Sequence, residues 1–349
     1  MSPAFPEDVA VAIVCYNNRA TLGTTLASLE AAGCPPGRVL VVDGASTDGT
    51  VEWLRSAHPE VAVTTLAKNA GPNPGRNLAL RDAPQPYLFL MDADVQVQPD
   101  TIQRLRIAVG RDKTIGIGSP IVVHAGDPST IQYAGGSLHF ICEAINPWMN
   151  RPLSARGTAP ADVGVASGNG LLLDRDAAIA VGLFDERYFM GKDDGDFTHR
   201  VRIGGYRILE VPDALVLHGS RPRSDWLFYY QLRNRWHFML KNYQWRTLLA
   251  IAPCLALHEP LQLLLLHVTG HGGTYWKAVR GLVAMLPDLG RDRARVAAFR
   301  RLPDGALLRS DRLIVRDDLM PPLARLGKGL YDRWLAAYWS LLRHTVLAG

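Results

Sequence analysis

Two aspartates one residue apart are the residues of this chain whose chemistry is most specific. Asp92 and Asp94 follow the apolar run 88–91. Such a run predicts a buried strand, so both carboxylates are expected where that strand ends. Carboxylate oxygens are ligands that Mg²⁺ and Mn²⁺ prefer, and two of them suit a cation that bridges a diphosphate. The alternative at this point is that both aspartates merely cap the turn that follows the strand.

A second acidic cluster lies a hundred residues further on. Asp193, Asp194 and Asp196 open a stretch with the pattern of a helix, 193–203. Acidic side chains stabilise a helix N-terminus, so a purely structural role is the plain interpretation. A carboxylate within reach of a hydroxyl can also remove its proton. Lys192 is expected to lower the pKa of a neighbouring carboxylate if its side chain faces the cluster.

Alternating strand and helix patterns position the first aspartate pair. Between Val9 and about Val123 the order predicts an α/β fold, with a mostly parallel sheet and helices on its faces. Ligands of such sheets bind beyond the carboxyl ends of the strands, where Tyr16, Asp43 and Asp92 fall. The expected strands are 9–16, 39–42, 61–66 and 87–91, and the expected helices begin near Leu22, Val51 and Pro74.

The pattern changes after residue 123. Residues 124–163 are rich in Gly, Pro and Ser and are expected to form loops, including a lid. Order is expected to return with a strand at 163–173, a short helix at 174–181, and one or two strands at 207–217 broken at Pro212. Beyond His218 the chain is expected to be helical, most clearly at 226–241 and 274–286.

Charge and tryptophan are concentrated after His218. Residues 1–218 hold 18 Lys and Arg against 24 Asp and Glu, whereas residues 219–349 hold 20 against 9, so the net charges are −6 and +11. Six of the eight tryptophans lie in the basic part. Trp suits the headgroup layer of a bilayer, so the combination favours an anionic membrane surface as the partner and argues against nucleic acid.

Compartment and membrane topology follow from smaller signals. The opening ten residues have neither a basic start nor an apolar run, and the four cysteines have no paired spacing, so a cytoplasmic location is expected. The most apolar stretch, 247–268, is interrupted by Pro253, His258, Glu259 and Pro260. We therefore expect an interfacial segment at the inner face of the membrane rather than a simple transmembrane helix.

Taken together in their order, four motifs resemble glycosyltransferase family 2. They are Val41-Val-Asp43-Gly-Ala-Ser-Thr-Asp-Gly-Thr50, Asn69-Ala-Gly-Pro-Asn-Pro-Gly-Arg76-Asn77, the pair Asp92 and Asp94, and Phe189-Met-Gly-Lys-Asp193-Asp194-Gly-Asp196-Phe197. The resemblance begins near Val11 and runs to about Asn242. It implies a GT-A fold, and an inverting enzyme that moves a sugar from a nucleoside-diphosphate sugar, of the UDP or dTDP type, to an acceptor hydroxyl.

The resemblance also implies roles for individual residues. Tyr16 and Asn17 begin the family pattern on the donor side, and Asp43 is expected to bond the pyrimidine base. Arg76 and Asn77 are expected beside the nucleotide and Asp92 near the ribose. Asp94 is expected to hold the metal, Mg²⁺ or Mn²⁺, with His218 completing its shell. Asp194 is the expected general base, with Asp193 as the alternative because the family often has Glu there.

Two further arginines and the domain limits complete the prediction. The segment 229–235 resembles a Tyr-Tyr…Arg-Asn element of the family, in which Arg233 and Arg235 are candidates to hold a phosphate of donor or acceptor; an exposed basic helix face is the alternative. We expect a catalytic domain at 1–243, with a nucleotide-sugar half at 1–123 and an acceptor half at 124–243. Residues 244–349 are expected to form a helical, basic extension.

Two other classes of protein remain open at this point. A nucleotidyltransferase that makes a nucleotide sugar shares the α/β core, although it usually has a Gly-rich basic loop after the first strand, which is absent between Cys15 and Ala20. A non-catalytic module that binds nucleotide sugars is the second alternative. The expected acceptor is a saccharide or lipid-linked glycan at the membrane, and a homodimer is the competing use of the C-terminal surface.

Overall fold

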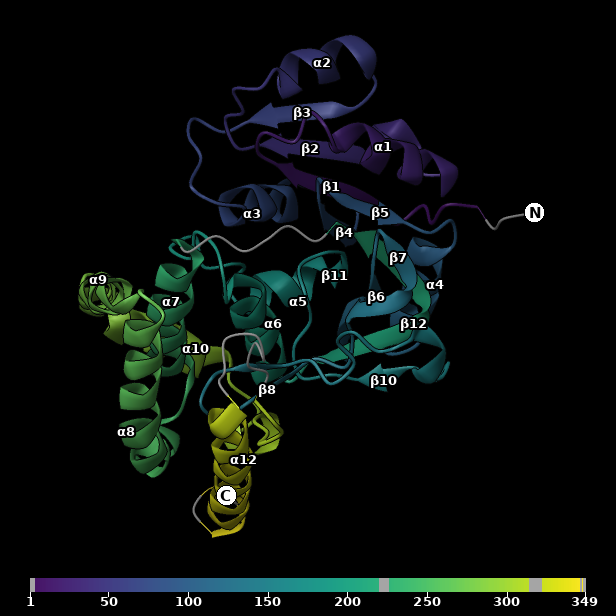
Figure 1. Ribbon diagram of the computed structural model, residues 1–349. Helices are drawn as coiled ribbons and strands as arrows, with labels where there is room; N and C mark the ends of the chain where they lie inside the picture. The colour runs from purple at the N-terminus through teal and green to yellow at the C-terminus, as the bar shows by residue number, and fades with distance from the viewer. Residues whose placement is uncertain (1–3, 220–225, 314–321, 346, 348–349) are drawn as a thin grey trace.

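A single large sheet organises the molecule. The structure is a computed structural model that describes residues 4–219, 226–313, 322–345 and 347 (Figure 1). The main path of the sheet has the strand order β10-β12-β6-β11-β4-β1-β2-β3, with β5 beside β12 and β7 beside β6. Helices flank the sheet, and a group of long helices lies at the end of the molecule opposite to β3 and α2. The α/β, GT-A expectation is confirmed.

The first half of the sheet is parallel, as the sequence predicts. β1 (Val9–Cys15) pairs with β2 (Val39–Asp43) and β4 (Tyr87–Asp92), and β2 pairs with β3 (Ala62–Thr65). α1 (Leu22–Ala31), α2 (Thr50–Ala57) and α3 (Asn73–Asp82) form the connections. Each observed bound lies within two residues of its expected position, because buried apolar runs and helix spacing are strong local signals.

Both faces of this parallel sheet are buried. Side chains alternate along β1, so Val9, Val11 and Ile13 pack in one apolar core while Ala10 and Ala12 pack in the other. When helices cover both faces of a parallel sheet, its strands have apolar residues at nearly every position. Polar side chains on these strands therefore occur at the strand ends.

The second half of the sheet has mixed directions. β11 (Leu171–Asp174) is antiparallel to β4 and to β6 (Ile115–His124), whereas β12 (Arg207–His218) is parallel to β6. β5 (Val95–Val97) pairs antiparallel with the end of β12, which places Val95 opposite His218. α4 (Thr101–Gly110) joins β5 to β6, and α5 (Arg175–Ala180) follows β11.

Residues 124–163 are more ordered than predicted. Where loops were expected, the chain forms β7 (Asp127–Tyr133) against β6, the two-stranded sheet of β8 (Ser137–Leu138) and β9 (Ala144–Ile145), and β10 (Ala161–Asp162) against β12. Pairing with distant strands stabilises these segments, and a local sequence window does not contain that information. The strand expected at 163–173 is confined to β11.

The observed bounds of α6 and β12 agree better with those predicted from the sequence. α6 (Asp193–Ile203) has the expected bounds. β12 is one strand rather than two, because a register shift between Val211 and Leu215 accommodates Pro212 without breaking the pairing to β6. A bulge of this kind is one of the few places where a strand tolerates proline.

Long helices dominate the C-terminal part. α7 (Trp226–Asn242), α8 (Trp245–Val268), α9 (Gly272–Val283), α10 (Leu289–Phe299), the short α11 (Asp304–Leu307) and α12 (Pro322–Thr345) follow one another. α8 is continuous through Pro253 and Pro260. The expectation that this segment is interfacial and does not cross a membrane stays a prediction. Among the described residues, α8 is the one helix long and apolar enough to cross a membrane, and 11% of its most apolar window is buried. The predicted domain boundary after residue 243 stays a prediction.

Candidate active site

A buried arginine joins the two acidic clusters. Arg76, in the first turn of α3, donates to Asp193 Oδ2 at 2.8 Å and to Asp92 Oδ1 at 3.0 Å. Its side chain is almost fully buried, and its guanidinium lies over the ring of Phe184. The ends of β4, α3 and α6 thus meet at one point, although their residues are far apart in sequence.

Close packing explains why glycine precedes this arginine. A Cβ at Gly75 would lie 3.1 Å from Val14 and 3.2 Å from Val42. The absence of a side chain lets the first turn of α3 approach β1 and β2, which brings Arg76 to the carboxyl end of β4. A larger residue at 75 would push the guanidinium away from both carboxylates.

The electrostatics distinguish the two adjacent aspartates of α6. Burial raises the pKa of Asp193 to about 6, against the opposing effect of Arg76 and with a further rise from Asp194. Although burial disfavours the charge of Arg76, Asp92 and Asp193 raise its pKa overall. Both oxygens of Asp194 accept backbone N–H groups, from Gly168 at 3.0 Å and from Gly195 at 2.7 Å. Asp193 is buried against a cation, whereas Asp194 is partly exposed and faces the loop at Gly168.

A second pair of candidate ligands converges at the end of β12. His218 Nε2 lies 3.7 Å from Asp94 Oδ1. This proximity follows from the sheet, because His218 pairs with Val95, the residue after Asp94. Among the described residues no group of three His, Cys, Asp or Glu side chains could hold a metal ion. Two protein ligands plus phosphate oxygens and water make a normal Mg²⁺ or Mn²⁺ shell, so the donor set fits the expected metal.

Gln132 orients the imidazole of His218 through a hydrogen bond. Its Oε1 accepts from His218 Nδ1 at 2.7 Å, and Asn169 Nδ2 lies 3.5 Å from the same nitrogen. Since an amide oxygen only accepts, Nδ1 carries the hydrogen and Nε2 presents its lone pair toward Asp94. Hydrogen bonds of this kind orient metal ligands in many proteins. Sequence reasoning missed Gln132, which lies on β7 in the stretch expected to be loop.

The expected donor-side residues form a tight turn. Asp43 is fully buried, and its carboxylate accepts from the backbone N–H of Ser46 at 2.9 Å and from the Ser46 hydroxyl. Asn17, with a positive φ of 53°, accepts from the N–H of Thr47 at 2.8 Å. The ring of Tyr16 is 44% exposed beside this turn. Contact of these side chains with a nucleotide stays a prediction.

Asn77 is fixed by the segment that leads to α6. Its side-chain N–H groups reach the carbonyl of Phe184 at 2.9 Å and Glu186 at 2.8 Å, and its oxygen accepts from the N–H of Phe184 at 2.8 Å. These bonds attach α3 to residues 184–186. The structure therefore gives Asn77 a role in positioning the segment that leads to α6, and its predicted place beside the nucleotide stays a prediction.

The two arginines of α7 point into the protein rather than toward the aspartates. Arg233 donates to the carbonyl of Arg187 at 2.8 Å and lies over the rings of Tyr229 and Tyr230. Arg235 is buried and pairs with Glu259 of α8 and, at 3.6 Å, with Glu143. Protein groups thus account for the charge of Arg235, and neither arginine forms an exposed basic face. Phosphate binding by either residue stays a prediction.

Lys192 does not face the cluster that follows it. Its ammonium donates to Glu143 at 2.7 Å and to the carbonyl of Cys142 at 2.8 Å. Despite the opposing effect of burial, Lys192 holds the pKa of Glu143 below its usual value. The expectation that Lys192 lowers the pKa of a neighbouring aspartate fails because its backbone is left-handed, with φ at 62°, and its side chain turns away.

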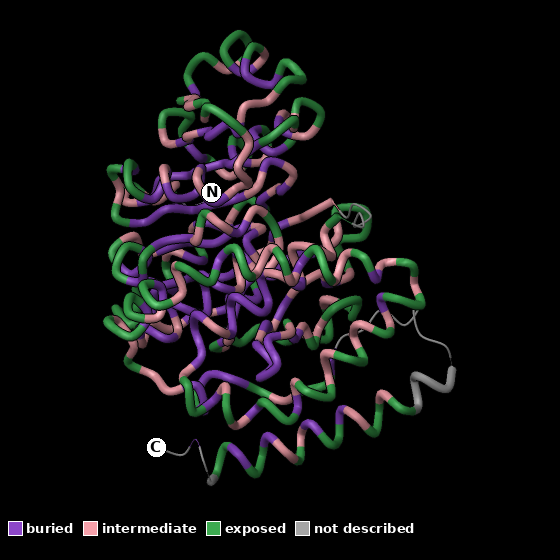
Figure 2. Tube along the Cα trace, turned by 90° about the vertical axis from the view of Figure 1, so that its left-hand side faces the viewer, coloured by how far each residue is buried: buried purple, intermediate pink, exposed green. Residues whose placement is uncertain are grey.

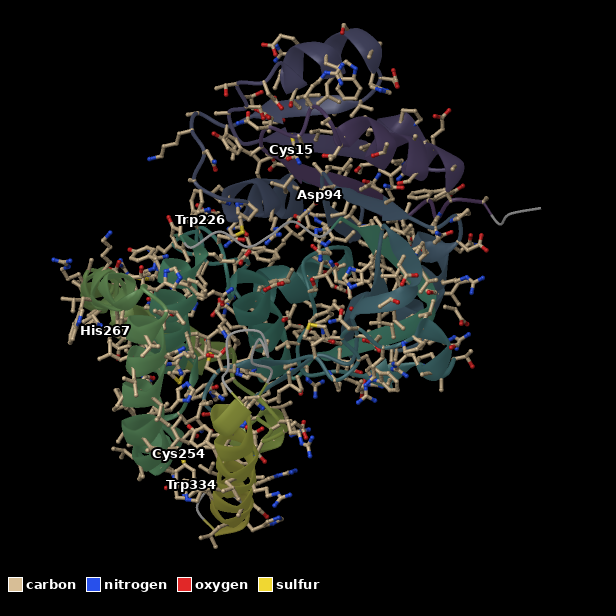
Figure 3. The ribbon with its side chains drawn as sticks, viewed as in Figure 1. Cys15, Asp94, Trp226, Cys254, His267 and Trp334 are labelled. Carbon is tan, nitrogen blue, oxygen red and sulfur yellow. The ribbon has the colours of Figure 1, made fainter. Side chains whose placement is uncertain are left out.

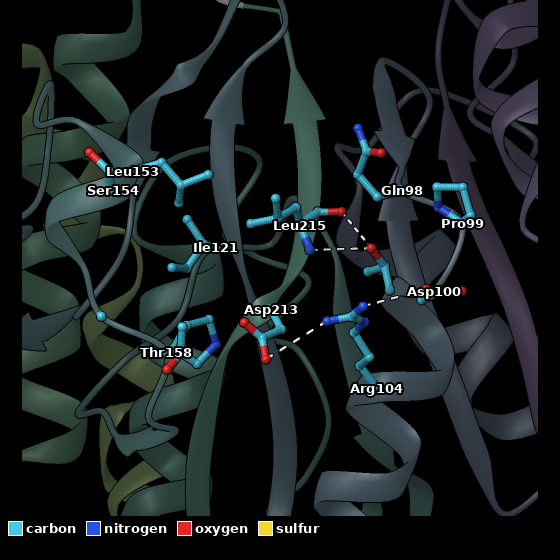
Figure 4. A pocket seen from close by; sticks show the side chains of 13 residues that line it. Gln98, Pro99, Asp100, Arg104, Ile121, Leu153, Ser154, Thr158, Asp213 and Leu215 are labelled. Carbon is cyan, nitrogen blue, oxygen red and sulfur yellow. Dashed lines mark hydrogen bonds and ion pairs between the residues drawn. The ribbon is translucent and has the colours of Figure 1, made fainter.

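A cavity among the described residues lies away from these side chains. It has a volume of about 490 Å³ and lies between β5, α4 and the middle of β12 (Figure 4). Its polar side chains satisfy one another, since Arg104 pairs with Asp100 and Asp213. None of the predicted site residues lines it. Asp94, labelled in Figure 3, is partly exposed, and the acidic site is distinct from this cavity.

Comparison with known proteins identifies the family. The family model "Glycosyl transferase family 2" matches residues 10–178. N-acetylglucosaminyl-diphospho-decaprenol L-rhamnosyltransferase of Mycobacterium tuberculosis (strain ATCC 25618 / H37Rv) is 31% identical over 233 residues, which cover 60% of this chain and 75% of that protein. The chain belongs to glycosyl transferase family 2. It is accordingly a glycosyltransferase, and the nucleotidyltransferase alternative is wrong.

Two more distant likenesses agree with the assignment. Poly-beta-1,6-N-acetyl-D-glucosamine synthase of Staphylococcus aureus (strain N315) is 23% identical over 217 residues, 60% of this chain and 49% of that protein. The crystal structure of GalNAc-T7 with UDP, GalNAc and Mn²⁺ superposes with a TM-score of 0.54 at 19% identity, over 67% of this chain and 48% of that one. The chain thus spans about half the length of these two proteins, and the second likeness supports the GT-A fold alone.

Proposed function

We propose that this family 2 glycosyltransferase inverts the anomeric centre of a sugar as it moves that sugar from a nucleoside diphosphate to an acceptor hydroxyl. The donor is of the UDP or dTDP type, as the sequence resemblance implies. The acceptor is a saccharide or lipid-linked glycan at a membrane. The lipid-linked class is supported by the name of the rhamnosyltransferase relative, which gives its acceptor as N-acetylglucosaminyl-diphospho-decaprenol.

The observation that carries the proposal is the difference between the two adjacent aspartates of α6. Asp193 is buried and bound to Arg76, whereas Asp194 is partly exposed and held by backbone N–H groups. A general base must be reachable by the acceptor and must be ionised at working pH. Asp194 meets the first condition better than Asp193, whose carboxylate is buried and bound to Arg76.

In the proposed step Asp194 takes the proton of the acceptor hydroxyl. The oxygen then forms a bond to the anomeric carbon while the bond from that carbon to the diphosphate oxygen breaks, and the diphosphate leaves with the electron pair. Attack from the face opposite the leaving group inverts the centre. Arg76 fixes Asp92 and Asp193 so that β4 and α6 keep their separation during the reaction.

Asp94 and His218 are the residues that would hold Mg²⁺ or Mn²⁺. When bound, the cation neutralises charge on a diphosphate leaving group. Gln132 keeps the imidazole in place, and Asp94 approaches it from the neighbouring strand. The fit rests on the donor set and on the tautomer that Gln132 selects.

The membrane association expected from the sequence belongs to the same proposal. The basic C-terminal part would keep the enzyme at the inner face of the cell membrane, where lipid-linked acceptors are accessible. A homodimer through the same helices is the alternative, and sizing of the purified protein distinguishes the two.

The experiment that tests the proposal combines binding with product analysis. Purified protein is mixed with Mn²⁺ and a panel of nucleoside-diphosphate sugars, and a binder raises the unfolding midpoint by mass action. The sugar that binds is then tested with lipid-linked acceptors, and the anomeric configuration of the product is read by NMR. Inversion with release of the nucleoside diphosphate supports the proposal. Tight binding without turnover over a broad acceptor panel indicates the non-catalytic module, and retention contradicts the role of Asp194.

A further inference from the structure

A helix at a water-exposed surface usually turns its polar residues to the solvent and its apolar residues to the protein. The helix α8 has the reverse arrangement for most of its residues. Its exposed apolar residues include Leu249, Leu264 and Val268, which are 74%, 60% and 76% exposed. Leu257 and Leu261 are exposed between them, and Trp245 begins the row. Arg246 and His267, near the two ends, are the only exposed polar residues of the helix. A 24-residue helix is about 36 Å long, so this face is larger than the scattered apolar residues of an ordinary surface.

The polar residues of α8 face the protein. Glu259 accepts from the indole N–H of Trp236 at 3.0 Å and pairs with Arg235, which also donates to Gln262 at 3.0 Å. His258 Nδ1 and the hydroxyl of Tyr331 on α12 lie 3.1 Å apart. A helix that turns its charge inward and its leucines outward has a non-aqueous neighbour on its outer side.

The charged residues near α8 indicate what kind of partner its apolar face contacts. Between Trp245 and Leu286 the sequence contains one acidic residue, Glu259, which is paired inside the protein. The exposed charged residues there are Arg246, Lys277 and Arg280. Basic residues close to an anionic bilayer strengthen the attraction to it. A positively charged border around an apolar face complements anionic headgroups around acyl chains.

Contacts along the whole helix decide its orientation. Thr247, Ile251, Cys254 and Leu266 are buried at intervals from its beginning to its end. α12 runs antiparallel beside it, since Tyr338 donates to the carbonyl of Ala250 at 2.7 Å and Tyr331 lies at His258. Figure 2 shows buried and exposed residues alternating along the long helix next to the C-terminus. A helix attached to the protein at every turn lies along a membrane surface and does not cross it.

We propose that the outward face of α8 inserts into the plane of an anionic bilayer, so that the enzyme is held by one side of this helix. Leu330 and Leu341 of α12 and Trp276 of α9 are further exposed apolar residues on the helices that pack against α8. This inference rests on the membrane association proposed above and names the surface that makes it, and binding through this surface requires neither donor, metal nor acceptor.

An ionic chain links this face to the acidic site. Glu259 of α8 pairs with Arg235, Arg235 lies 3.6 Å from Glu143, and Glu143 accepts from Lys192 at 2.7 Å. Lys192 immediately precedes Asp193 and Asp194. Because the chain connects α8 to the start of α6, the membrane face and the acidic site keep a fixed relation.

Co-flotation of the full-length protein with vesicles of phosphatidylcholine and phosphatidylglycerol tests the surface. We expect the wild type to float with the vesicles, and the variant Leu249→Glu/Leu264→Glu to lose at least about tenfold in partition, because two inserted leucines become charges. The matched control is Ile107→Glu/Ile179→Glu, whose residues are 52% and 48% exposed on α4 and α5. It should bind as the wild type does, and circular dichroism should show that all three proteins are folded.

Two results would overturn the proposal. One is equal partition of the α8 variant and the wild type. The other is a wild type that stays unbound and forms a dimer that the α8 variant weakens, which would assign the face to a second copy of the chain. Failure of either kind leaves the donor-binding and product experiments intact.

The orientation has its own measurement. A fluorophore attached to cysteine introduced at Leu249, Leu257 or Leu264 reports depth through quenching by brominated lipids, and the four native cysteines are all buried. Similar depths at the three positions support the in-plane arrangement. A depth that changes steadily along the helix indicates a spanning helix and contradicts it.

Discussion

The parallel half of the sheet and the C-terminal helices use opposite arrangements of polarity. In the half formed by β1 to β4, apolar side chains are buried on both faces and charges gather at the strand ends. In α8 the acidic residue Glu259 is paired inside the protein, and leucines are exposed on the outer side. The first arrangement exposes a polar edge, and the second exposes an apolar side. The comparison teaches that this molecule keeps its polar edge and its exposed apolar side on different elements, which is what the proposed membrane association requires.

The strongest test of the first arrangement is removal of its buried cation. Arg76→Ala leaves Asp92 and Asp193 near each other without their arginine, and breaking a buried ion pair costs about 3–5 kcal/mol. We expect the free energy of unfolding, measured by urea denaturation, to fall by that amount. Arg81→Ala, an exposed arginine on the same helix, should change it by less than about 0.5 kcal/mol. Equal effects of the two variants would show that Arg76 is not the centre of the site.

The two regions should also differ in how much stability they lose at acidic pH. Burial lowers the pKa of His199 and His258 to about 3 and that of His139 and His237 to about 4. The unfolded chain then binds more protons below about pH 6.5, so stability is lost as pH falls from there toward these values. At pH 5 a fully buried histidine of this kind costs about 2 kcal/mol.

The ionisation of Asp193 changes the free energy of unfolding in the opposite direction over the same pH range. Its folded pKa of about 6 exceeds the unfolded value, so its contribution falls as pH rises from about 4 to 6. Since residues 4–123 contain only His58, hydrogen exchange at pH 5 should open the α6 to α9 region before β1 to β4. Simultaneous opening of both regions would contradict the difference.

The comparison also shows which features the sequence could reveal. Strand ends that carry Asp43, Asp92 and Asp94 were predictable because a buried strand is a local pattern. The choice between Asp193 and Asp194 was not, since it depends on Arg76 arriving from a distant helix. Gln132 was missed because β7 forms only through pairing with β6. The orientation of α8 could not be read from composition, which does not say which side of the helix meets Arg235.

A smaller effect is expected for a residue that contacts one of the proposed metal ligands. Gln132→Ala removes the acceptor that fixes the tautomer of His218, and loss of such a partner typically weakens metal affinity by about tenfold or somewhat more. Calorimetric titration of Mn²⁺ in the presence of the nucleoside diphosphate measures the change. Gln132→Glu keeps an acceptor oxygen and should retain most of the affinity. Unchanged affinity in the alanine variant would exclude the positioning role.

Metal dependence itself is tested by Asp94→Ala. This variant should lose turnover and the Mn²⁺-dependent rise in unfolding midpoint caused by the donor, because one of two protein ligands is gone. Asp100→Ala, which removes an exposed acid at the start of α4, is the control and should keep both. Full turnover of the Asp94 variant in excess chelator would refute the assignment.

Single-turnover kinetics of Asp194→Asn and Asp193→Asn test the central claim most directly. The claim is that the exposed carboxylate, and not the one buried against Arg76, removes the acceptor proton. We expect Asp194→Asn to keep donor affinity and the fold while the rate falls by about 10²–10⁴-fold, the usual contribution of a general base. Asp193→Asn should lower the rate less, and through a change in stability. A large rate loss in a well-folded Asp193→Asn protein, with little loss in Asp194→Asn, would contradict the account.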